Sequence, residues 1–414
     1  MKVLNISRLG NRIKSLFVIG TNAEGSLILC GSGEKLSGFQ LSHRIEFYEF
    51  DPITEDLKED IFNDLNLLHS FFELYKNKVY TINGIGYFIE PEDTQRINII
   101  KCDFNHYTYE RLFSICIHES NNDLNNEFTM GNIQLTLLSD RYLAIKLYNK
   151  KTCQFDIYDV EERTKYDLIF AENDDMRYAD IHCIDIDGRP YILFVKNGKS
   201  NWKMEFYIHK WKWTEGFIKY KDEKIFLFPL DELISKGKVY LDDTYKIVQV
   251  GETHDMHYHG YFNHCIVYSC KDLRHYEKDG ACEDVIYEDN IFFYDIRKKI
   301  TTNISYDRHI LISNKDVIYG YENINGQLVI KNLISNQLYA IPNCNGWFLK
   351  IIDDLLIMRF NCGIVIYDLK KGIEIEKHYT ENQYPHAMQP EFRTILAVQQ
   401  EFKYLANEDL LVLY

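Results

Sequence analysis

Seven stretches of this chain end in the same way, with alternating apolar residues, usually an aromatic, and then a polar residue that enters a turn. The last residues of the seven stretches are Asp51, Asp103, Asp159, Lys210, Asp295, Asn332 and Asp368. Successive copies end 36 to 56 residues apart, except for an interval of 85 residues between the fourth and the fifth. Recurring units of this length in an all-β chain are typical of a propeller or a solenoid.

Each copy is interpreted as the third strand in a group of four. Around Asp159, segments suited to strands cover residues 133–138, 142–148, 154–159 and 166–170, with short polar turns between them. The same order recurs over residues 309–341 and 347–378. Four antiparallel strands joined by short turns form the blade of a β-propeller, so the sequence predicts an all-β fold of this kind.

The two ends of the chain supply strands that complete each other. Residues 394–399, 402–405 and 410–414 match the first three strands of a further blade, and residues 1–7 can supply its fourth. Such sharing removes exposed sheet edges. We therefore favour eight blades, with seven as the alternative, closed by pairing of the N- and C-terminal strands. Residues 1–414 are expected to form a single propeller domain with an insertion at about 230–289, between the fourth and fifth blades.

The third strands resemble the degenerate repeat of WD-like and YVTN-like propellers. The motif is written here as Ile-Tyr-Asp at 157–159 and 366–368 and as Phe-Tyr-Asp at 293–295. The sequence has no Trp before these Asp residues, no Gly-His dipeptide and no double Gly of the kelch type. The resemblance therefore implies a fold and no particular activity. Because a carboxylate at this position accepts hydrogen bonds from the backbone of the following turn, we expect the repeated Asp residues to be structural.

Composition limits the classes of partner. The formal net charge of −15 disfavours binding to nucleic acid and to anionic lipid. No apolar run is long enough to span a membrane, and the first residues do not resemble a signal peptide. The ten cysteines form no CxxC pair and several lie in expected strands, so we expect free buried thiols and a cytoplasmic location.

A histidine-rich segment follows the expected strand at residues 245–250. It contains His254, His257 and His259, and further histidines, His182 and His309, lie in or before expected innermost strands. Imidazole nitrogens at such spacing can bind zinc, iron or copper, so these five residues are the candidate ligands of a divalent metal near the propeller axis. The alternative interpretation is that each histidine is structural or solvated.

The sequence leaves two functions open. The first is a recognition module for a protein, peptide or small-molecule ligand, because no P-loop, dinucleotide or serine-hydrolase motif is present. The second is a metal-dependent enzyme, a lyase, hydrolase or oxidase, with the histidine-rich site near the axis. The sequence identifies no catalytic residue, and it leaves the oligomeric state open.

Overall fold

The computed structural model describes most of the expected strands. The described residues are 2–5, 14–37, 40–51, 53–62, 81–92, 96–116, 133–148, 153–170, 176, 179–196, 203–207, 210–214, 223–250, 254–272, 288–305, 310–312, 318–324, 327–333, 335–342, 347–352, 354–360, 363–379, 394–397 and 410–413.

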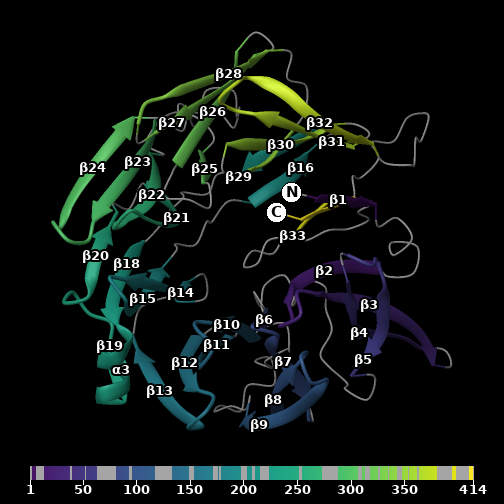
Figure 1. Cartoon of the computed structure of the whole chain (residues 1–414). Coiled ribbons are helices and arrows are strands. Elements are labelled where there is room, and N and C mark those ends of the chain that lie inside the picture. Colours follow the sequence, from purple (N-terminus) through teal and green to yellow (C-terminus); the bar gives the residue numbers. More distant parts are fainter. Residues whose placement is uncertain are drawn as a thin grey trace.

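Within these residues, seven sheets succeed one another around a ring, each with four antiparallel blade strands and one of them with a fifth strand at its edge, so the chain is an all-β propeller (Figure 1). Blade one contains β2 (Lys14–Thr21), β3 (Leu27–Ser37), β4 (Gln40–Phe50) and β5 (Leu57–Ile61). Blade two contains β6 (Thr81–Ile82), β7 (Ile85–Pro91), β8 (Arg96–Asp103) and β9 (Thr108–Cys116). Blade three contains β10 (Ile133–Leu137), β11 (Tyr142–Tyr148), β12 (Cys153–Asp159) and β13 (Thr164–Ile169). Blades four and five are β14 (Asp180–Ile186), β15 (Arg189–Lys196), β18 (Lys224–Pro229), β20 (Lys246–Gln249); and β21 (His254–Phe262), β22 (Cys265–Asp272), β23 (Glu288–Asp295), β24 (Ile300–Ser305). Blades six and seven are β25 (Ile310–Ile312), β26 (Ile318–Ile324), β27 (Gln327–Asn332), β28 (Leu338–Pro342); and β29 (Trp347–Ile352), β30 (Leu355–Phe360), β31 (Gly363–Asp368), β32 (Ile373–Tyr379).

The preference for eight blades is wrong, and the seven-bladed alternative is observed. The remaining terminal strands, β1 (Lys2–Asn5), β33 (Thr394–Ala397) and β34 (Leu410–Leu413), form a three-stranded sheet instead. In this sheet β1 is antiparallel to β34, but β33 is parallel to β34 and adjacent to it, which breaks the antiparallel order of a blade. The expected second strand, 402–405, lies outside the described residues. Figure 1 places this sheet between blade seven and blade one.

The prediction that the fourth repeat copy forms a blade strand is also wrong. Its residues fall in a separate hairpin of β16 (Lys203–Tyr207) and β17 (Lys210–Thr214), and β18 takes the third position of blade four. The alternation of polar and apolar residues is the same in a blade strand and in an inserted hairpin, so the pattern could not distinguish them. Strands β20, β21 and β22 are blade strands as well, although they lie within the insertion expected at about 230–289.

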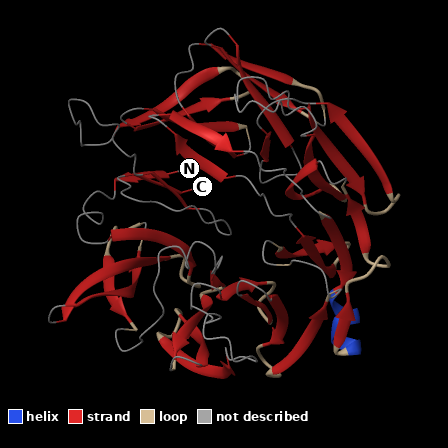
Figure 2. Cartoon of the chain, turned by 180° about the vertical axis from the view of Figure 1, so that it is seen from behind, coloured by secondary structure: helices blue, strands red, loops and turns tan. Residues whose placement is uncertain are grey.

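The one helix within the described residues is α3 (Leu230–Lys236). It leads into β19 (Lys238–Tyr240), which pairs in parallel with β13 at the outer edge of blade three. Figure 2 shows this helix on the periphery of a molecule that is otherwise built from strands. A segment between the third and fourth strands of blade four therefore covers the edge of blade three.

The core is divided among the interfaces between neighbouring blades. Between blades one and two, the ring of Phe47 lies 4.9 Å from that of Phe88 and 5.2 Å from that of Phe104, in edge-to-face geometry. Between blades three and four, the rings of Phe155 and Phe194 are 4.9 Å apart. Aromatic side chains bury a large area from each flat sheet, which explains the aromatic content of the chain.

The repeated Asp residues are structural, as expected. Oδ1 of Asp103 accepts hydrogen bonds from the backbone N–H groups of Asn105 and His106 at 2.9 and 3.2 Å. The equivalent atom of Asp295 accepts one from Lys298 at 2.9 Å. In every such turn the fourth residue after the Asp or Asn has a left-handed backbone. These residues are Glu55, Tyr107, Arg163, Lys299, Asn336 and Gly372.

Replacing Lys299 with glycine is expected to stabilise the protein, because glycine adopts a left-handed backbone more readily than lysine does. Lys299 has φ 55°, a conformation that costs a residue with a side chain about 1 kcal/mol more than glycine. We expect the free energy of unfolding to rise by about 0.5 kcal/mol in a urea titration, after the greater freedom of glycine in the unfolded chain is subtracted. Lys298→Gly is the control, because Lys298 lies in the same turn without a positive φ. Equal losses of stability in both variants would contradict this explanation of the turn.

Candidate functional site

The histidine-rich segment forms the innermost strand of blade five. A bulge between Tyr258 and Gly260 makes His259 an extra residue in the pairing of β21 with β22, and Nε2 of His259 lies 2.8 Å from Oγ of the buried Ser269. His257, which pairs with Ser269 across the strands, is exposed. The hydrogen bond therefore gives His259 a structural contact.

Three of the five candidate metal ligands, His182, His257 and His259, have side chains that the structure describes. His182 lies in β14 of blade four, and its ring is 4.9 Å from the ring of Tyr258. Among the side chains that the structure describes, no three His, Cys, Asp or Glu groups are close enough to share a metal ion. His309 and the side chain of His254 lie outside the described residues, so a metal site that includes them stays a prediction.

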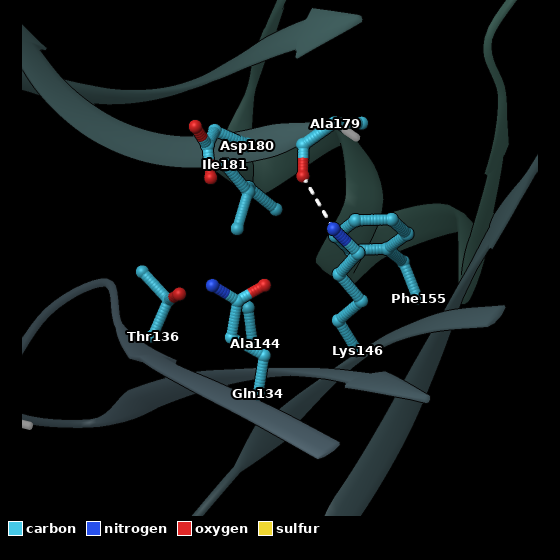
Figure 3. Close-up of a pocket in the computed structure, with 8 residues that line it drawn as sticks. All are labelled: Gln134, Thr136, Ala144, Lys146, Phe155, Ala179, Asp180 and Ile181. Atoms are coloured by element: carbon cyan, nitrogen blue, oxygen red, sulfur yellow. Dashed lines mark hydrogen bonds between the residues drawn. The ribbon is translucent and has the colours of Figure 1, made fainter. Parts of the chain in front are cut away.

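A pocket with a different composition lies between blades three and four (Figure 3). We call it the inter-blade pocket. About 200 Å³ of space lies between its lining side chains, and this volume includes open solvent. Its lining residues are Gln134, Thr136, Ala144, Lys146, Phe155, Ala179, Asp180 and Ile181.

The strand register explains how this pocket forms. Gln134 and Thr136 are two residues apart on β10, so they share one face of the sheet, and their partners on β11 are Lys146 and Ala144. Ala144 and Ala179 are small, and they leave space between the longer polar side chains. The residues of blade four, from Ala179 to Ile181, cover this face at the start of its innermost strand.

Lys146 is the most unusual residue in the pocket. Its side chain lies in an otherwise apolar stretch of β11, and the residue is 6% exposed. Nζ donates a hydrogen bond of 2.8 Å to the carbonyl oxygen of Ala179 in blade four, drawn as a dashed line in Figure 3. The same atom lies 5.3 Å from the centre of the Phe155 ring, within reach of a cation–π interaction. A buried ammonium therefore lies at the boundary between two blades.

The other polar groups of the pocket complement this charge. Figure 3 shows the carboxylate of Asp180 on the side opposite the ammonium of Lys146, with the amide of Gln134 and the hydroxyl of Thr136 below. The pocket thus combines a cation, an anion and two neutral hydrogen-bonding groups. A few precisely placed polar groups in a concave surface are typical of small-molecule sites.

The cysteines match the expectation of buried thiols in part. Cys30 and Cys102 lie in the interface between blades one and two, and burial raises the pKa of both thiols far above the ordinary value. Burial, together with the charge of Asp185, raises the pKa of Cys183 to about 11. These thiols are protonated at neutral pH, so they are poor nucleophiles.

Comparisons with known proteins agree on the fold. No family model matches the chain, and no curated protein matches its sequence. Among solved structures, puromycin hydrolase is 9% identical with a TM-score of 0.50, and the match covers 96% of this chain and 59% of that one. The propeller domain of the Trilobed protease from Pyrococcus furiosus is 12% identical with a TM-score of 0.42, and the match covers 91% of this chain and 99% of that one. Sqt1 of Saccharomyces cerevisiae is 8% identical with a TM-score of 0.44, and the match covers 99% of this chain and 97% of that one.

The chain is therefore a seven-bladed β-propeller, and at these identities the likeness extends to the fold alone. Within the residues that the structure describes, no helix has the length and apolar character needed to cross a membrane.

Proposed function

We propose that this propeller is a recognition module that binds a small molecule, or the end of a peptide, in the inter-blade pocket. The observation that carries the proposal is the buried ammonium of Lys146, which shares the pocket with Asp180, Gln134 and Thr136. Burying a charged group is costly unless it gains strong partners, and binding sites are places where that cost is tolerated.

The size of the pocket limits the ligand. The inter-blade pocket is narrow, and its volume of about 200 Å³ includes open solvent, so a ligand can contact its lining only from the opening. A ligand that contacts both blades would also stabilise their interface, because binding to the folded state alone raises its stability.

Replacing Thr136 with leucine is expected to abolish this binding, because the larger side chain fills the pocket. We would measure the shift in unfolding temperature with a panel of amino acids, carboxylic acids, amines, sugars and nucleosides. Thr108→Leu is the control, because Thr108 is exposed at the start of β9 and does not line the pocket. At least one compound should raise the unfolding temperature of the wild type and of Thr108→Leu, but not that of Thr136→Leu. If no compound separates the two variants, the proposal is wrong.

We also propose that the chain is one propeller domain and that the terminal sheet closes its ring. The antiparallel register from Lys2 with Leu413 to Asn5 with Leu410 supports this proposal, since it joins the two ends of the chain by backbone pairing. A ring closed in this way has no unpaired strand between its first and last blades.

A further inference from the structure

A segment of blade four is built into the sheet of blade three. Residues 230–241, which we call the latch, contain α3 and β19 and lie between the third and fourth strands of blade four. The backbone N–H of Asp167 in β13 donates a hydrogen bond of 3.2 Å to the carbonyl oxygen of Gly237, and that of Leu241 donates one of 2.9 Å to the carbonyl oxygen of Ile169. Among the blade sheets that the structure describes, only that of blade three contains a strand from the segment of another blade.

The helix of the latch is attached to blade four. The guanidinium of Arg189, at the start of β15, donates hydrogen bonds of 2.7 and 3.1 Å to the carboxylate of Asp231 in α3. The hydroxyl of Tyr245, directly before β20, donates one of 2.5 Å to Glu232. Gly237, in the left-handed region with φ 74°, ends the helix and allows the chain to turn toward β13. The two ends of the latch therefore contact different blades.

The latch also contributes to the apolar core between these blades. Leu233 of its helix is 0% exposed, and Val239 of its strand is 1% exposed. Both belong to one cluster with residues of the two blades, among them Leu168 of β13 and Phe228 of β18. Because burial of apolar surface stabilises packed elements, the latch adds to the stability of this boundary.

We infer that the latch is a conformational lock that holds the boundary between blades three and four closed. The chain itself passes directly from blade three to blade four once, between Ile169 and Asp180. With the latch in place, the outer parts of the two blades separate only if β19 leaves β13 or α3 leaves blade four. Regions of a protein open locally according to the contacts that hold them, so this boundary opens more readily when the latch is weakened.

Thiols at three blade boundaries can report this opening. Cys183 packs against the cluster that contains the latch, and Cys270 belongs to the cluster between blades four and five. Cys30 and Cys102 belong to the cluster between blades one and two. We would measure the rate at which a bulky maleimide modifies each thiol in the folded protein, with peptide mapping of the products. A reagent of this size reaches a thiol between two blades only when the blades separate.

Val239→Ala weakens the latch without changing a blade strand. It removes two buried methyl groups, so we expect Cys183 to be modified about tenfold faster, while the other three thiols keep their wild-type rates. Val248→Ala is the matched control, because Val248 is a buried valine of β20 in the cluster between blades four and five. This control should accelerate the modification of Cys270 and leave that of Cys183 unchanged. An unchanged rate at Cys183 in Val239→Ala, equal acceleration of all four thiols, or the same acceleration of Cys183 by Val248→Ala would overturn the inference.

Discussion

Replacing Asp159 with alanine is expected to lower the free energy of unfolding by about 3 kcal/mol. Asp159 is fully buried, and its Oδ1 accepts hydrogen bonds of 3.0 Å from the backbone N–H groups of both Glu161 and Glu162. Its Oδ2 accepts a third from Nε of Arg141 at 2.8 Å. Alanine would leave these three donors without their acceptor. A denaturant titration monitored by tryptophan fluorescence measures the loss.

Asp295→Ala is the matched control, because Asp295 occupies the same turn position in blade five. Its side chain is 22% exposed, and water can replace the bond it accepts from Lys298. We expect a loss of about 1 kcal/mol for this variant. Equal losses of unfolding free energy in the two variants would contradict the prediction. They would show that neither the burial of Asp159 nor its hydrogen bond from Arg141 adds stability to the turn of blade three.

The same contact makes the protein sensitive to acid. Burial acts to raise the pKa of Asp159, but the hydrogen bonds from Arg141 and from the backbone outweigh it and hold the pKa below its ordinary value of 3.8. The carboxylate therefore contributes its full stability above the ordinary pKa, and this contribution is lost as the pH falls through the lower pKa of the folded state. Asp159→Ala should accordingly lose less stability on acidification than the wild type does.

Replacing Gly20 with alanine is expected to destabilise the contact between blades one and two by about 3 kcal/mol. Gly20 has φ 147°, and a Cβ atom added to it would lie 1.8 Å from Oγ1 of Thr81 in blade two. That hydroxyl donates a hydrogen bond of 3.1 Å to the carbonyl oxygen of Ile19, so it cannot move away without losing this contact. The innermost strands of the two blades meet closely here because residue 20 has no side chain.

Gly25→Ala separates the effect of the clash from that of the backbone. Gly25 also has a positive φ, 88°, but a Cβ atom there would meet nothing within 4 Å. We expect a loss of about 1 kcal/mol, from the backbone conformation alone. Thermal unfolding of both variants makes the comparison, and a loss for Gly20→Ala no larger than that for Gly25→Ala would contradict the close approach to Thr81.

The local features of this fold could be predicted because their interactions are local. The turn after Asp103 depends on hydrogen bonds to residues two and three positions later, and the Asp in the sequence indicates them directly. Strand β31 ends at Asp368, the last residue of its expected repeat copy, for the same reason. The left-handed residue four positions after each Asp or Asn was missed, because six different residue types occupy this position.

The features that were predicted wrongly depend on distant partners. Residues 203–214 have the alternation of a blade strand, and only the pairing of β18 with β15 excludes them from the blade. Likewise, the terminal segments contain strands, but the parallel pairing of β33 with β34 is a choice of partner that local pattern does not encode.

The candidate site shows the same contrast between local patterns, which the sequence displays, and contacts between distant residues, which it does not. The histidine-rich run was conspicuous in the sequence, yet the described histidines of blades four and five do not form a metal centre among themselves. The inter-blade pocket was missed because Lys146 and Asp180 are 34 positions apart and meet only when two blades pack. The one available signal was a lysine inside the apolar stretch 142–148.

A cysteine pair at Val3 and Val412 tests most directly whether the chain forms one ring in which its two ends meet. The two residues are partners in the antiparallel pairing of β1 with β34, and the Cα separation of such partners, roughly 4.5 to 5.5 Å, permits a disulfide. Val3→Cys with Leu411→Cys is the control, because adjacent residues of a strand point to opposite faces. Peptide mapping of the oxidised monomer should find the bond between positions 3 and 412 and none in the control. A pair that stays reduced, or that links only separate molecules, would contradict the ring.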